Sequence, residues 1–181
     1  MTSAQSPKAV AVPAIAFVLA TAALLAPEGL VATAPTSRAC SAPAYRAFDF
    51  WIGDWNVSDF PGADNVAHVR VERALGGCVL HEFYEDGTGG KGESFSIYDA
   101  SRGVWHQTWV TNHGTLLTIE GNPHHGEMLL SGVQRVEGGG RKQVRGVWRP
   151  VTGGVRETAV TSLDGGKTWK AWFDLLFRRR V

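Results

Sequence analysis

The chain has 181 residues, which is enough for one domain with a hydrophobic core of its own. It has 18 lysines and arginines against 17 aspartates and glutamates, and without Lys8, Arg38 and Glu28 the remaining residues 40–181 have 16 of each sign. This balance lacks the positive surplus by which proteins bind nucleic acid or anionic membrane surfaces, so we expect neither partner.

The first part of the chain has the pattern of an export signal. Residues 9–26 are almost wholly apolar, Lys8 precedes them, and small residues follow. A basic start, an apolar core and a small-residue cleavage region make up a secretory signal peptide. We therefore predict a signal peptide and linker over residues 1–39 and an extracytoplasmic domain over residues 40–181, with no membrane association after cleavage. An uncleaved anchor is the alternative, because the apolar run approaches the length that spans a bilayer.

The chain has two cysteines, Cys40 and Cys78, and both lie in the part predicted to be exported. Two thiols in an oxidising compartment favour one disulfide, which would tie the start of the domain to the start of a strand. The alternative is a free buried Cys78 and an unpaired Cys40.

From Gly53 onward, short apolar runs alternate with turn residues. After a short helical lead-in over residues 44–52, we expect ten strands, at residues 53–60, 65–75, 78–86, 92–100, 103–111, 115–121, 127–136, 142–150, 154–163 and 168–178. The segments between them, such as Gly76-Gly77 and Asn122-Pro123, contain residues that favour tight turns. This pattern predicts an all-β fold, an antiparallel up-and-down barrel of about ten strands, with a two-sheet sandwich as the alternative.

Alternation within the strands predicts which side chains face inward. Several of the expected inner faces combine large aromatic residues with one polar group, which suits a cavity for a small apolar or amphipathic ligand. The candidate ligand-binding residues are Tyr84, Glu82, Ser96, Trp105, Gln107, Trp109, Met128 and Phe173. A solid core with one satisfied polar residue per strand is the alternative.

Glu82 is the acid with the most unusual setting, because Leu80 and Tyr84 flank it on the same face. If it is buried, its pKa should rise, and it could serve as a general acid or base in a barrel enzyme. The simpler interpretation is a buried ion pair with one of three arginines, Arg145, Arg149 or Arg156. The six histidines match no metal-binding spacing, so we expect no metal and no cofactor.

Residues 162–169 (Ser-Leu-Asp-Gly-Gly-Lys-Thr-Trp) look like an Asp-box, a hairpin turn in which we expect Asp164 to accept backbone hydrogen bonds and Trp169 to anchor the next strand. The Gly53-x-Trp55 motif resembles that of lipocalins, and the strand count is similar to the fatty-acid-binding branch. The opening F-D-F-W-I-G-D-W, the block W-H-Q-T-W-V at residues 105–110 and the single Asp-box resemble a family of exported, lipocalin-like bacterial proteins. The resemblance implies a barrel with an internal cavity and no particular reaction.

Overall fold

The computed structural model describes residues 39–61 and 65–181. The predicted signal peptide and linker lie outside these residues, apart from Ala39. Within the described part, no helix is long and apolar enough to cross a membrane.

Ten strands form the fold, joined in sequence by short connections. They are β1 (Gly53–Asp59), β2 (Asn65–Ala74), β3 (Val79–Asp86), β4 (Lys91–Asp99), β5 (Val104–Thr111), β6 (Leu116–His124), β7 (Glu127–Arg135), β8 (Arg141–Val151), β9 (Gly154–Ser162) and β10 (Lys170–Arg179). Short 3₁₀ turns accompany them: η1 (Pro43–Arg46), η2 (Asp49–Trp51), η3 (Leu75–Gly77) and η4 (Glu137–Gly139).

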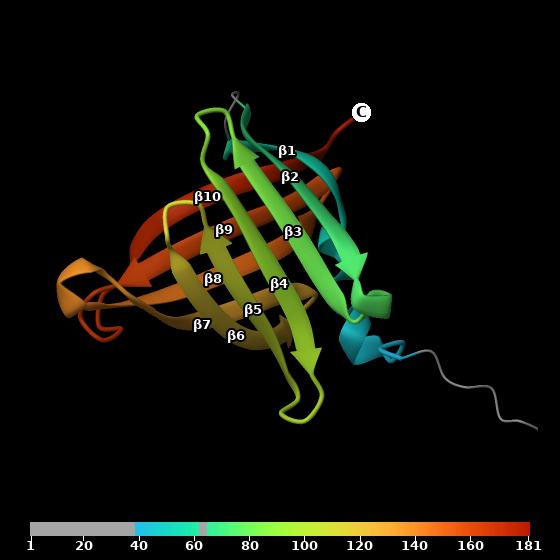
Figure 1. Ribbon diagram of the computed structural model, residues 1–181, viewed down its shortest axis with the longest axis horizontal. Coiled ribbons are helices and arrows are strands. Elements are labelled where there is room, and N and C mark those ends of the chain that lie inside the picture. Colours follow the sequence, from blue (N-terminus) through green and yellow to red (C-terminus); the bar gives the residue numbers. More distant parts are fainter. Residues whose placement is uncertain (1–38, 62–64) are drawn as a thin grey trace, which may run out of the picture. The chain divides into compact units, whose positions relative to one another are not determined.

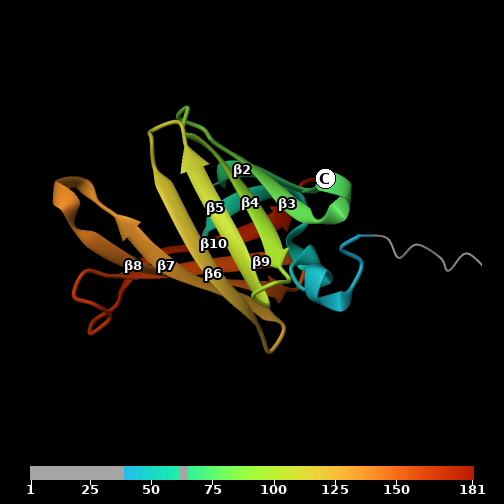
Figure 2. The same cartoon turned by 60° about the horizontal axis from the view of Figure 1, so that its bottom comes forward.

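Each strand pairs antiparallel with its neighbours in sequence, and the last strand returns to the first. The closing pair is β1 with β10, in which Val57 lies opposite Phe177 and Trp55 opposite Arg179. Figures 1 and 2 show the resulting barrel, with β10 running beside β1. A closed sheet has no unpaired edge, so the barrel is confirmed and the sandwich is excluded.

The hairpin between β6 and β7 differs from the expected one. Asn122-Pro123 was predicted to be a turn, but both residues belong to β6 and lie opposite Leu129 and Met128. The chain reverses instead at His125-Gly126, where φ is 49° and 83°. Two successive residues with positive φ make the turn whose twist matches that of the flanking strands, and a glycine at the second position adopts it without strain.

The predicted helical lead-in is present as the two 3₁₀ turns η1 and η2, and it covers one end of the barrel. Its aromatic residues Phe48 and Trp51 are buried, stacked on each other with ring centroids 5.0 Å apart. The Phe48 ring also meets Trp105 and Trp148 edge-on, at 5.7 Å and 5.5 Å. In Figure 1 this lead-in lies at the opposite end of the barrel from the β7–β8 and β9–β10 connections. The lead-in therefore acts as a plug for one end.

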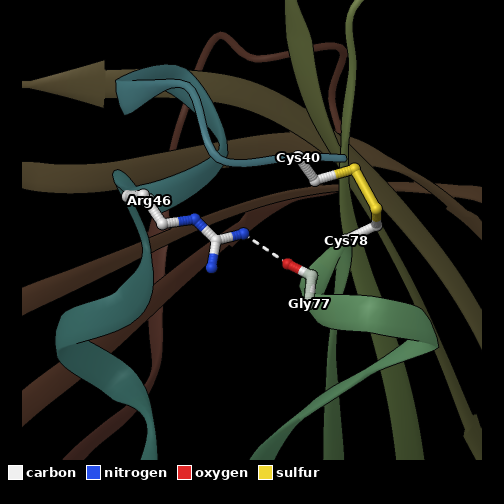
Figure 3. The surroundings of a disulfide bond; sticks show 4 residues. All are labelled: Cys40, Arg46, Gly77 and Cys78. Atoms are coloured by element: carbon white, nitrogen blue, oxygen red, sulfur yellow. Dashed lines mark hydrogen bonds between the residues drawn. A yellow bond between two sulfur atoms is a disulfide. The ribbon is translucent and has the colours of Figure 1, made fainter. Parts of the chain in front are cut away.

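A disulfide joins Cys40 to Cys78 and fastens the plug to the β2–β3 connection, as predicted (Figure 3). Beside it, the Arg46 guanidinium donates a hydrogen bond to the Gly77 carbonyl (Figure 3). On the other side of the plug, the Trp105 indole N–H donates to the Ala44 carbonyl at 3.1 Å. These bonds fix the plug to the β2–β3 connection and to β5.

Candidate functional site: an internal cavity with two buried carboxyl groups

The barrel interior contains a cavity of about 280 Å³. Its lining comes from β3, β5, β6, β8, β9 and β10, and most of it is apolar. The lining residues are Glu82, Tyr84, Gln107, Trp109, Leu117, Ile119, Val144, Gly146, Trp148, Glu157, Ala159, Trp172, Phe173, Leu175 and Phe177. The volume is near the lower limit for small-molecule sites, so the cavity fits a small ligand.

Glu82 on β3 is buried, with 7% of its surface exposed. Burial raises its pKa from 4.5 to about 7, and a hydrogen bond from Ser94 limits this rise. The Ser94 hydroxyl, on the neighbouring strand β4, donates to the Glu82 Oε2 atom at 2.6 Å. Ser94 itself is fully buried, so this bond is formed away from water.

A second carboxyl group, that of Glu157, enters the same cavity from β9. Its surroundings raise its pKa well above 4.5, first because burial disfavours the charged form and second because the Glu82 carboxylate repels it. A weaker opposing influence is the Trp148 indole, which is opposite Glu157 in the β8–β9 pairing. The Trp148 N–H is nevertheless buried and has no partner in hydrogen-bond geometry within residues 39–61 and 65–181. Glu157 is half-buried and belongs to the cavity lining.

The expected ion pair between Glu82 and an arginine is absent from the described residues. Arg149 bonds to Glu127 and Arg156 bonds to Asp174, both on the outer surface. Arg145 lies over the Trp169 ring, 3.9 Å from its centroid. Val144 and Gly146 line the cavity, so strand alternation turns Arg145 to the opposite face. The cavity carboxyl groups therefore have no counter-charge in the lining.

Tyr84 and Trp109 form one aromatic wall, with ring centroids 5.7 Å apart in an edge-to-face arrangement. Gly92 on β4 makes room for this wall, because a Cβ atom there would lie 2.3 Å from the Trp109 ring. The Tyr84 pKa is raised by burial, then by the nearby charges of Asp86, Glu82 and Glu157. Tyr84 and the two glutamates thus share one electrostatic environment.

Trp172 joins the cavity through an irregularity in β10. The pairing of β10 with β9 shifts register between Ala171 and Phe173, and this shift makes Trp172 an extra, bulged residue. A bulge changes the direction of a side chain, and here two consecutive residues, Trp172 and Phe173, both line the cavity. Trp172 remains 45% exposed, so it belongs to the rim. The Lys142 ammonium lies over its ring, 4.3 Å from the centroid.

The structure brings together five of the eight predicted ligand-binding residues in the cavity lining: Glu82, Tyr84, Gln107, Trp109 and Phe173. Ser96 is buried behind the wall and accepts a hydrogen bond from the Gln107 amide at 3.0 Å. Trp105 and Met128 are buried in the core and lie outside the lining. Trp105 instead packs against Phe48 of the plug.

Three further lining residues, Trp148, Glu157 and Trp172, are not among the predicted site residues. Strand alternation would have found the first two, since Val144, Gly146 and Trp148 share one face of β8, and Val155, Glu157 and Ala159 share one face of β9. Trp172 could not have been found in this way, because the bulge breaks the alternation.

The Asp-box turn between β9 and β10 forms as predicted. Asp164 Oδ1 accepts hydrogen bonds from the backbone N–H groups of Lys167 and Thr168, at 3.0 and 2.9 Å. The Trp169 indole donates to the Gly166 carbonyl at 3.0 Å. The turn leads directly into the bulged start of β10, so it has a structural role at the cavity rim.

The fold and site together define a ten-stranded antiparallel barrel with a small, acidic and aromatic internal cavity. No protein-family model matches the chain, and no curated protein matches it either.

Proposed function

We propose that this protein is an exported, lipocalin-like barrel that binds a small apolar or amphipathic molecule in its internal cavity. The observation that carries the proposal is the internal cavity of about 280 Å³, which has mainly apolar walls and the polar side chains of Glu82, Gln107 and Glu157 in its lining. Apolar walls supply affinity, and a few polar groups orient the ligand.

Export is part of the proposal, and the disulfide supports it. The bond between Cys40 and Cys78 suits an oxidising compartment outside the cytoplasm, where disulfides persist. Intact-mass measurement of the protein from its own host tests cleavage near residue 39. A mass that retains residues 1–38 would contradict the proposed removal of the signal peptide.

Binding is tested by blocking the cavity from within. Ala159 is buried in the lining, so Ala159→Phe places a ring inside the cavity, whereas Ala171→Phe on the exposed start of β10 is the matched control. The probe is 2-phenylethanol, titrated while the tryptophan indole N–H signals are followed by NMR. We expect shifts in the wild type and in Ala171→Phe, and none in Ala159→Phe. Equal shifts in all three proteins would place binding elsewhere, and no shifts at all would indicate a closed core.

A second candidate function is catalysis in the same cavity, as a hydrolase or an isomerase or cyclase. It is favoured by one observation, the raised pKa of Glu82 at about 7, which suits a general acid or base. Glu82→Gln should then abolish turnover while the fold persists. Unchanged turnover in this variant would exclude Glu82 as the acid or base.

A further inference from the structure

The two carboxyl groups in the cavity have no internal partner of opposite charge. Glu82 comes from β3 and Glu157 from β9, with β2, β1 and β10 between these strands in the sheet. They face one space, because both side chains line the same cavity. The lining contains no lysine, arginine or histidine. A barrel with a purely structural interior has no need of two such groups, since each one costs desolvation energy.

Each carboxyl group has a hydrogen-bond donor beside it that would stabilise the ionised form. Ser94 donates to Glu82 Oε2, which leaves Oε1 without a hydrogen bond among the described residues. Trp148 lies opposite Glu157 in the β8–β9 pairing, and its buried indole N–H has no hydrogen-bond partner among the described residues. A buried N–H group bonds more strongly to a charged carboxylate than to a neutral carboxylic acid, so both donors favour the charged form. The site is therefore arranged for charged carboxylates that need a cation.

The aromatic side chains in the cavity walls also suit a cation. Tyr84, Trp109, Trp148, Trp172 and Phe173 present aromatic rings to the cavity. The faces of such rings attract ammonium groups, most strongly where water is excluded. The rim already shows this contact in the Lys142 ammonium over Trp172, although Lys142 itself is outside the lining.

We propose that the ligand of this cavity is a small organic cation, a protonated amine on an aromatic or alicyclic body, held between Glu82 and Glu157. The inference rests on the proposed binding function and specifies its ligand class. An anionic amphiphile such as a fatty acid is disfavoured, because its carboxylate would add a third negative group to a space without a cation. A neutral ligand would not favour ionisation of either acid, so the nearby donors would form only the weaker hydrogen bonds of neutral carboxyl groups.

The test compares three probes of similar size and different charge: 2-phenylethylamine, 2-phenylethanol and 3-phenylpropionate. Isothermal titration calorimetry at about pH 7 is run on the full chain in buffers with different ionisation enthalpies. We expect the amine to bind about tenfold or more tightly than the alcohol, because it gains charge-assisted hydrogen bonds, and the acid to bind weakest. We also expect amine binding to release protons, because Glu82 and Glu157 ionise as the cation arrives, and alcohol binding to release none.

Two variants assign the effect to the carboxyl groups. Glu82→Gln and Glu157→Gln keep the shape of the side chain and remove the charge, and each should weaken amine binding about tenfold without weakening alcohol binding. Glu93→Gln is the matched control, because Glu93 lies on the outer face of β4, where it bonds to His81. It should leave all three affinities unchanged.

The outcomes separate this inference from the proposed function. If the alcohol binds in the cavity but the amine binds no more tightly and releases no protons, the cation inference is wrong and the binding function stands. If amine preference persists in both glutamine variants, the two carboxyl groups are not its cause and the inference also fails. If none of the probes binds at millimolar concentration, both proposals are contradicted.

Discussion

At the scale of single residues, Glu82 and Glu157 stand out because they are acids placed in an apolar interior. Moving a carboxylate out of water is unfavourable, so both groups hold their protons to higher pH than free glutamate does. One hydrogen bond from Ser94 offsets part of this effect for Glu82. The fold therefore tolerates these residues mainly in their neutral form when no ligand is bound.

This placement predicts a pH-dependent stability. Below about pH 4.5, Glu82 is protonated in both the folded and unfolded states, and the fold has its full stability. Between about 4.5 and 7 the unfolded chain ionises while folded Glu82 does not, so the free energy of unfolding falls as pH rises and levels off above about 7. The shift corresponds to a loss of about 3 kcal/mol.

Glu82→Gln should remove this loss, because glutamine does not ionise and can still accept from Ser94. Urea unfolding of the wild type and the variant at about pH 5 and pH 8 checks the expectation. The variant should lose about 2.5 kcal/mol less between the two conditions, because part of the loss has already occurred at pH 5. The same loss in both proteins would show that Glu82 titrates normally in the folded state.

At the scale of elements, the positions and faces of the strands could be predicted from the sequence, but the place of a residue along the barrel could not. The strands were located to within a few residues, because alternation and turn residues are local signals. Glu82, Gln107 and Trp109 were placed on inner faces for the same reason. The depth of a residue along the barrel is a tertiary property, so Trp105 was expected at the cavity but packs under the plug.

Phe48→Ala tests the plug as an element. The ring is fully buried between Trp51, Trp105 and Trp148, so its removal should lower the free energy of unfolding by about 3–5 kcal/mol. Phe95→Ala is the control, because this ring on β4 is 45% exposed, and we expect a much smaller loss. Thermal and urea unfolding measure the free energy of unfolding of each variant and of the wild type. A loss for Phe48→Ala as small as that expected for Phe95→Ala would mean that the plug contributes little to the core.

At the scale of the whole molecule, the barrel divides into a packed end and a hollow end. The plug end contains the largest fully buried side chains, including Trp51, Trp55 and Trp105. The other end contains the cavity rim, where Trp172 is partly exposed and the Asp-box turn begins β10. A closed sheet connects the two ends, but local opening is easier where fewer apolar groups are packed.

Native-state hydrogen exchange should therefore show a gradient along the barrel. Backbone amides near the plug, such as those of Trp55 and Phe177, should exchange only through global unfolding, because these residues lie in the paired strands β1 and β10 and are buried in the core. Amides at the start of β10, near Trp172, should exchange faster through local opening. A bound ligand should slow exchange at the hollow end and leave the local opening of the plug end unchanged. Uniform protection at both ends would contradict this division and indicate a solid core.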